Sequence, residues 1–309
     1  MSARHEPVLL AESLGFLRNG PGLYLDATLG DGGHADALLA SEPEARLLGT
    51  DQDPAALAFS RGRLARYGNR VMIAQAAFRE VPSVHAGLGG EPFTGVMLDL
   101  GLSSRQIDDP ERGISFMSDG PLDLRLDPTR GVPVSERLAT VEPDELAQVL
   151  REHGDVPMAA RLARTMVQAA RAGELERTRA LAHLVDRALG GHAHPRRHAQ
   201  VFQALRIWIN EEAQDLESML EWLPGAVRPG GVVVTLAYHS GEDRRIKQAL
   251  RGRPETVPAR RLPPGTERRS ASPPWEDLTR RGVVASDQEK LANPRARSAR
   301  LRAFRRTTA

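Results

Sequence analysis

A glycine-rich turn between two short apolar segments constrains this chain more than any other feature. Residues 24–34 read Tyr-Leu-Asp-Ala-Thr-Leu-Gly-Asp-Gly-Gly-His, and the apolar pair Leu47-Leu48 precedes Asp51. A strand, a glycine loop, a helix and a second strand that ends in an acid form the first half of a nucleotide-binding βαβ unit. Asp51 lies about 20 residues after Gly30, the spacing at which a carboxylate meets ribose hydroxyls. The pattern therefore predicts a site for an adenosine-type cofactor.

This pattern does not identify the cofactor. Gly30-x-Gly32-x-x-Ala35 also fits the dinucleotide fingerprint, so an NAD-dependent dehydrogenase is an alternative. Glycines also mark ordinary turns, although few such turns have an acid at the required distance. The choice between these interpretations depends on the rest of the chain.

Composition sets the protein class. The chain has 309 residues, of which 40% are hydrophobic and 27% charged, as in globular proteins with more than one domain or a large insertion. It has no cysteine, which excludes disulfides, thiolate metal sites and cysteine nucleophiles. Its apolar stretches are too short to span a membrane, and the polar N-terminus lacks a signal-peptide core. We therefore expect a cytoplasmic protein with no membrane partner.

The charge of the chain is divided unevenly. From Arg251 to the C-terminus there are 15 Lys+Arg and 6 Asp+Glu, whereas the preceding residues contain 27 and 34. A GC-rich genome would explain why nearly all the basic residues are Arg. The clustering of charge instead favours a basic C-terminal segment that faces nucleic acid.

The remaining apolar patterns predict an α/β fold. Four more strands are expected, and the near-continuous apolar runs among them are typical of parallel strands covered on both faces. The expected strands are 71–74, 95–100, 230–238 and 297–304. About 130 residues separate the second and third of these strands, far more than a crossover needs. This segment shows helical periodicity over 144–152, 158–172, 178–189 and 200–223.

Seven sequence strings connect the chain to a known family. They are His5-Glu-Pro-Val-Leu-Leu10, Asp26-Ala-Thr-Leu-Gly-Asp-Gly-Gly-His34, Asp99-Leu-Gly-Leu-Ser-Ser104, Arg112-Gly-Ile-Ser-Phe-Met-Ser-Asp-Gly-Pro-Leu-Asp-Leu-Arg-Leu-Asp-Pro128, Phe202-Gln-Ala-Leu-Arg-Ile207, His239-Ser-Gly-Glu-Asp-Arg244 and Asn293-Pro-Arg-Ala-Arg-Ser298. Together, in this order, they closely resemble the bacterial 16S rRNA cytosine-N4 methyltransferase family (RsmH, also called MraW). The resemblance extends from about residue 5 to residue 303.

The resemblance implies a fold, a cofactor and a substrate. It implies a Rossmann-like methyltransferase sheet that binds S-adenosylmethionine (SAM), with an inserted all-helical substrate-recognition domain. The expected boundaries are 1–107 and 206–309 for the methyltransferase domain and 108–205 for the insertion. The implied substrate is the exocyclic N4 amine of a decoding-centre cytidine in 16S rRNA, within the small ribosomal subunit. A homo-oligomer is left open.

The resemblance also implies which residues form the site. The implied cofactor-binding residues are Gly32, Gly33, His34, Asp51, Phe78, Asp99 and Gln106. Loop amides suit the methionine carboxylate, Asp51 the ribose hydroxyls and Phe78 the adenine ring. Asp99 and His239 are the catalytic candidates, because both should lie at strand ends above the methyl group. A non-catalytic RNA-binding module on the same fold is a second alternative.

Two further motifs suggest chemistry that we do not expect. Ser272-Pro-Pro-Trp275 matches a tetrapeptide of amino-group methyltransferases, but it lies far beyond the fourth strand and fits a proline turn better. His192, His194 and His198 have the spacing of metal ligands, but no carboxylate accompanies them closely and Pro195 interrupts the helix that would align them. No metal site is therefore predicted.

Overall fold

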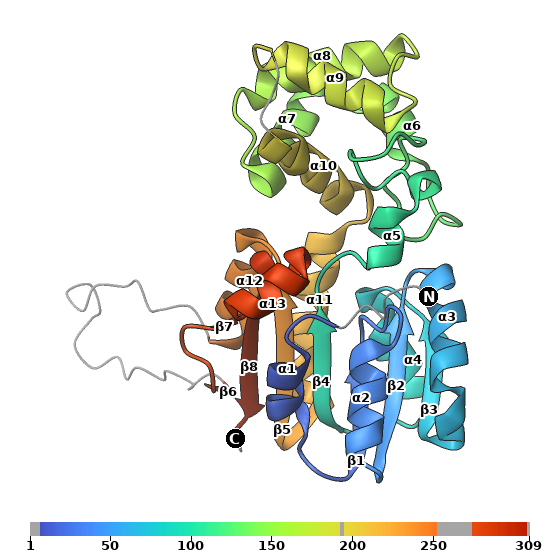
Figure 1. The fold of residues 1–309 in the computed structure, drawn as a ribbon, viewed down its shortest axis with the longest axis vertical. Helices are drawn as coiled ribbons and strands as arrows, with labels where there is room; N and C mark the ends of the chain where they lie inside the picture. The colour runs from blue at the N-terminus through green and yellow to red at the C-terminus, as the bar shows by residue number, and fades with distance from the viewer. Residues whose placement is uncertain (1–6, 192–194, 252–273, 308–309) are drawn as a thin grey trace, which may run out of the picture. The chain divides into compact units, whose positions relative to one another are not determined.

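The computed structural model of this chain describes residues 7–191, 195–251 and 274–307. The chain divides into two compact units (Figure 1). The first unit combines Met1–Gly101 with Asp215–Ala309, and the second is the intervening Leu102–Gln214. The helical unit is therefore wider at both ends than the 108–205 expected from sequence.

The first unit is built on an eight-stranded sheet with the order β3-β2-β1-β4-β5-β8-β6, and β7 also pairs with β8. The strands are β1 Gly22–Asp26, β2 Ala45–Asp51, β3 Val71–Gln75, β4 Phe93–Asp99, β5 Val227–Ala237, β6 Trp275–Asp277, β7 Val283–Val284 and β8 Arg300–Arg306. Strands β1 to β5 pair with one another in parallel, and β8 is antiparallel to β5. The predicted α/β class with a Rossmann-like sheet is confirmed.

The strand order reverses next to β1. Residue Asp26 at the end of β1 is opposite Gly49 of β2 on one side and Met97 of β4 on the other. From β1 the chain continues to β2 and then β3 on one side of β1. It then crosses back, so that β4 pairs with β1 on the other side. Ligands of open α/β sheets bind at such a switch point, outside the carboxyl ends of the strands.

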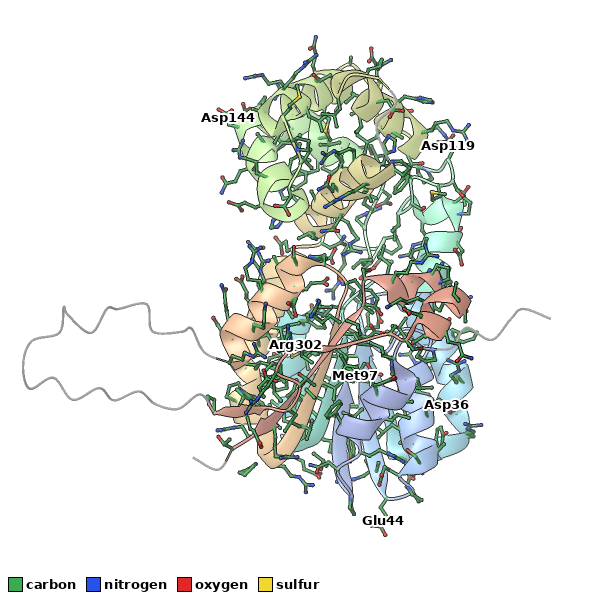
Figure 2. All side chains as sticks on the ribbon, turned by 60° about the vertical axis from the view of Figure 1, so that its left-hand side comes forward. Asp36, Glu44, Met97, Asp119, Asp144 and Arg302 are labelled. Carbon is green, nitrogen blue, oxygen red and sulfur yellow. The ribbon has the colours of Figure 1, made fainter. Side chains whose placement is uncertain are left out.

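Helices cover both faces of this sheet. The helices are α1 Leu10–Leu17, α2 Gly33–Ser41, α3 Pro54–Leu64, α4 Val81–Gly87, α11 Glu212–Ala226, α12 Ser240–Leu250 and α13 Asp287–Ala292. Leucines of α1, α2 and α3 share one core with alternate strand residues such as Met97 (Figure 2). Side chains of α4, α11 and α12 pack with the opposite residues of the same strands. The alternation explains why the strand segments are apolar almost without interruption.

The second unit has a separate core. Its helices are α5 Ser104–Asp108, α6 Val134–Thr140, α7 Pro143–Gly154, α8 Ala159–Arg171, α9 Thr178–Ala188 and α10 Pro195–Ile209. One continuous cluster of buried side chains, drawn from residues 122–205, fills the space between helices α6 to α10. This matches the predicted helical periodicity, because each helix turns one apolar stripe inward.

One predicted helix is wrong in its extent. Residues 200–223 were expected as a single helix, but α10 ends at Ile209 and α11 begins at Glu212. Glu211 adopts a left-handed backbone with φ of 54°. The Asn210 side chain donates to the Leu124 carbonyl and accepts from the Leu126 backbone amide at 2.8 Å each. These bonds replace the helical ones at the break and tie it to the loop before α6.

The structure describes only part of the Ser272–Trp275 and His192–His198 motifs. Trp275 begins β6 and is buried, and the Pro274 carbonyl accepts from the Thr307 amide at 2.9 Å. His198 contacts Asp186 at 2.9 Å. Ser272, Pro273, His192 and His194 lie outside the described residues. Across residues 7–191, 195–251 and 274–307 we find no group of side chains suited to a metal ion, and no helix long and apolar enough to cross a membrane.

Candidate functional site

The predicted glycine loop joins β1 to α2 at the switch point. Gly32 caps the helix with a left-handed backbone, φ of 74°, which favours glycine. A Cβ on Gly33 would lie 2.4 Å from Cγ of Pro7, so this glycine permits close packing of the N-terminal segment. The N-cap residue offers no side chain to the first amides of α2. Those amides can therefore bind an anionic group of a ligand.

Asp51 connects this loop to the end of β2. Its Oδ2 accepts from the Gly30 amide at 2.8 Å, and its Oδ1 accepts from the Asp53 amide at 2.9 Å. Burial raises the pKa of Asp51 to about 6, although the two backbone bonds oppose the rise. Asp51 is thus mainly ionised at neutral pH, and its carboxylate retains capacity to accept from a further donor.

Asp99 gathers contacts from three other segments at the end of β4. Its backbone amide donates to Oγ1 of Thr28 at 2.6 Å. The Tyr238 hydroxyl, which follows β5, donates to Oδ1 of Asp99 at 2.8 Å. Burial and the neighbouring Asp99 carboxylate raise the pKa of Tyr238, so the phenol keeps its proton and continues to donate. The Asp99 side chain is 25% exposed and therefore remains accessible to a ligand.

His34 of α2 lies beside the same carboxylate. Its Nε2 lies 3.2 Å from the Val8 carbonyl and its Nδ1 lies 3.8 Å from Oδ2 of Asp99. Because a carbonyl only accepts, Nε2 carries the proton. Burial lowers the pKa of His34, although Asp99 opposes the shift, and the ring is neutral at pH 7. His34 therefore holds the N-terminal segment in place beside the site.

A further acid, Asp26, is buried below this edge. Its Oδ1 accepts from the Thr28 amide at 3.2 Å, and only 4% of the residue is exposed. Burial raises the pKa of Asp26 to about 7, and the Asp99 and Asp51 charges add to the rise. Three carboxyl groups thus meet where β1, β2 and β4 end, which gives this edge negative potential.

The other predicted residues occupy different positions. Phe78 begins the short helix η2 (Phe78–Glu80) after β3 and is half-buried against the core. Gln106 belongs to the helical unit, where its Oε1 accepts from the Ser103 amide at 2.9 Å. His239 caps α12, and its Nε2 lies 3.0 Å from Oε1 of Glu242. The structure therefore brings Gly32, Gly33, His34, Asp51 and Asp99 together, with Phe78 following the adjacent strand.

The basic C-terminal segment is partly structural. Arg302 of β8 is 3% exposed and pairs with Asp243 of α12. Arg305 pairs with Glu276, and Arg306 donates to the Pro274 carbonyl. Several of its arginines thus bind the last strand to its neighbours.

Comparison with known proteins identifies the family. The MraW methylase family matches residues 2–307. A ribosomal RNA small subunit methyltransferase H from Sorangium cellulosum is 43% identical over 92% of this chain and 85% of its own. Its counterpart from Thermomicrobium roseum is 42% identical over 99% and 94%. This chain belongs to the MraW methylase family.

A weaker likeness exists among solved structures. An rRNA methylase from Streptococcus thermophilus has 10% identity and a TM-score of 0.42 over 97% of this chain and 94% of its own. This likeness is too low to bear on the function of the methylase.

Sequence reasoning singled out His239 at the end of β5, whereas the methylase places Tyr238 on Asp99. The strand register contains the reason. Asp99, the last residue of β4, is opposite Leu236 of β5. Tyr238 and His239 therefore extend beyond the end of β4, and because successive side chains point to opposite faces, only one of them can point toward Asp99. A side-chain direction of this kind follows from pairing, which the sequence does not reveal by itself.

The buried acid gives a test of these electrostatics. In the unfolded chain, an aspartate such as Asp26 has a pKa near 3.9. Between about pH 4 and 7 the folded methylase therefore keeps a proton that the unfolded chain has lost, and its stability falls as the pH rises. Asp26→Asn removes this loss, so the variant should be more stable than the parent at pH 8 by on the order of a few kcal/mol, with little difference at pH 4.

Urea unfolding at both pH values measures the effect, with Glu44→Gln on the surface as control. An Asp26→Asn advantage that is the same at both pH values would contradict the assigned pKa.

Proposed function

We propose that this methylase transfers a methyl group from SAM to the N4 amine of a decoding-centre cytidine in 16S rRNA. The observation that carries the proposal is the meeting of Asp51, the uncapped α2 loop and Asp99 at one sheet edge. Membership of a methylase family supports methyl transfer, and the names of the relatives support small-subunit rRNA as substrate. Membership of a methylase family also argues against the alternative of an NAD-dependent dehydrogenase.

The residues at this edge fit SAM. The free amides of α2 suit its carboxylate, and Asp51 keeps lone pairs for the ribose hydroxyls. Asp26, Asp51 and Asp99 provide negative potential for a cationic sulfonium. Phe78 offers an aromatic face after β3, and we assign it to the adenine. Gln106 belongs to the helical unit, and its assignment to the cofactor rests on the family resemblance. When bound, SAM supplies an electrophilic methyl group.

The protein's own task in the reaction is mainly positioning. A cytosine amine is a weak nucleophile because its lone pair is delocalised into the ring. Asp99 can accept a hydrogen bond from this amine, which increases electron density on the attacking nitrogen. The Tyr238 hydroxyl donates to one Asp99 oxygen and so orients the carboxylate. His239 is turned toward its own helix, so we assign the accepting role to Asp99.

Product analysis tests the reaction directly. Purified protein, SAM and small subunits that lack the modification should yield N4-methylcytidine after digestion to nucleosides and mass spectrometry. Methylation at a carbon or ribose position, or no incorporation into 16S rRNA, would contradict the assignment. The second result would also revive the interpretation of a non-catalytic RNA-binding module.

The Asp51 assignment makes a separate prediction. Asp51→Ala removes a charge-assisted acceptor, and SAM affinity should fall by roughly 10- to 150-fold. Wild-type affinity should also weaken as the pH falls below about 6, because Asp51 becomes protonated. Calorimetry across pH 5–8 measures both effects, with Asp36→Ala as control, since the Asp36 carboxylate in α2 pairs with Arg66. Unchanged affinity in a folded Asp51→Ala protein would remove Asp51 from the site.

The helical unit is our candidate for the substrate-recognition domain. Its separate core lets it act as a folded module. Arg125 is excluded as a phosphate ligand, because Asp123 and the carbonyls of Arg130 and Gly131 occupy its guanidinium. Arg161 and Arg164 are exposed on α8, and neither has an acidic partner within the described part of this unit.

These two arginines can be tested together. Replacing Arg161 and Arg164 by Gln should raise the KM for rRNA and flatten the salt dependence of RNA binding, while SAM affinity stays constant. Arg46→Gln serves as the control, since Arg46 is an exposed arginine paired with Glu91. If the double variant behaved like this control, α8 would not face the RNA.

A further inference from the structure

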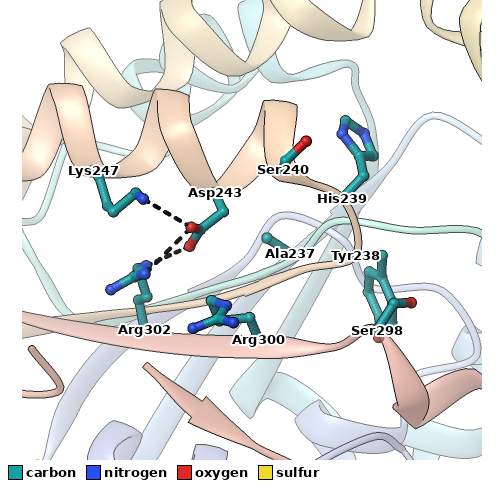
Figure 3. Close-up of a pocket in the computed structure, with 9 residues that line it drawn as sticks. All are labelled: Ala237, Tyr238, His239, Ser240, Asp243, Lys247, Ser298, Arg300 and Arg302. Atoms are coloured by element: carbon teal, nitrogen blue, oxygen red, sulfur yellow. Dashed lines mark hydrogen bonds and ion pairs between the residues drawn. The ribbon is translucent and has the colours of Figure 1, made fainter. Parts of the chain in front are cut away.

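A second hollow lies beside the proposed methyl-transfer site. This pocket of about 430 Å³ is bounded by the end of β5, by α12 and by the start of β8 (Figure 3). Tyr238 lines it and also donates to Asp99. A group held in this pocket would therefore lie next to the carboxylate that we assign to the target amine.

The pocket has an excess of positive charge. Lys247, Arg300 and Arg302 line it together with a single acid, Asp243. The Asp243 carboxylate binds Arg302 at 2.5 Å and Lys247 at 3.1 Å (Figure 3). Burial alone would raise the pKa of Asp243, but these two cations hold it below its usual value. Asp243 therefore stays ionised and neutralises only one of the three cations.

The Arg300 guanidinium is held in place by a hydrogen bond but is not paired with a carboxylate among the described residues. Its Nη1 donates to the Arg281 carbonyl at 2.8 Å, which orients the guanidinium. Among residues 7–191, 195–251 and 274–307 no carboxylate pairs with it. The hydroxyls of Ser240 and Ser298 also line the pocket, and neither has a hydrogen-bond partner in the same part of the chain. The pocket thus combines available N–H and O–H donors with net positive charge.

We propose that this pocket binds one phosphodiester of the RNA strand that carries the target cytidine. Arg300 and Lys247 would supply the charged contacts, and Ser240 and Ser298 the neutral donors. The planar Arg fork matches two phosphate oxygens, which makes phosphate a better fit than a point anion. Arg302, buried and bound to Asp243, positions Lys247 by sharing that carboxylate. The inference rests on the proposed function, because it requires an RNA substrate.

Neutralising variants test the pocket. Arg300→Gln and Lys247→Gln, each in the full chain, should weaken binding of a synthetic 16S decoding-region RNA by roughly tenfold. The slope of log Kd against log salt should fall by roughly 0.7–0.9, as expected for one lost phosphate contact. SAM affinity should not change. Arg305→Gln is the matched control, because Arg305 lies on the same strand, is exposed and pairs with Glu276 outside the pocket. Equal behaviour of pocket and control variants would overturn the proposal, as would a large loss of SAM affinity.

A second measurement changes the RNA instead of the protein. Single phosphodiesters near the target cytidine are replaced in turn by uncharged methylphosphonates. One position should weaken binding to the wild-type protein by roughly tenfold and have little further effect on Arg300→Gln. Independent, additive effects at every position would overturn the phosphate assignment. If the wild-type protein neither bound nor methylated the unmodified RNA, the proposed function would fall as well, so the two failures are distinguishable.

Discussion

A series of three hydrogen bonds between neighbouring strand ends determines the site. Asp51 after β2 accepts from Gly30 after β1, and Thr28 in the same turn accepts from the Asp99 amide at the end of β4. Tyr238 after β5 then donates to the Asp99 carboxylate. Each bond joins a side chain to the next strand, so the carboxyl ends of β2, β1, β4 and β5 are fixed as one edge. The cofactor loop and the proposed acceptor both depend on this edge.

The same edge carries an electrostatic cost. Burial raises the pKa of Asp26 to about 7, with the Asp99 and Asp51 charges adding to the rise, and burial together with the neighbouring Asp53 raises the pKa of Asp51 to about 6. A cation bound there would offset the repulsion among these carboxylates, so part of the binding free energy would come from relief of this cost. The basic pocket between α12 and β8 has the opposite sign. A cationic cofactor and an anionic RNA strand would thus be drawn to adjacent regions of one unit.

Much of this arrangement could be predicted from sequence, for identifiable physical reasons. Buried parallel strands need apolar residues on both faces, and the turn at Gly32 needs a positive φ, so both leave local patterns. The break at Glu211 was missed because its determinants are long-range bonds from Asn210 to the loop before α6. Tyr238 was underrated for a similar reason. Its role depends on the register of β5 against β4, and strand pairing is not encoded in any local pattern.

The central claim is that the carboxyl edge of this sheet holds the methyl donor. A crystal structure of the protein with S-adenosylhomocysteine tests it most directly. The account predicts the ligand across the ends of β1, β2 and β4, with its ribose on Asp51 and its carboxylate at the first amides of α2. A ligand bound in the pocket between α12 and β8, or one that left Asp51 without a contact, would contradict it.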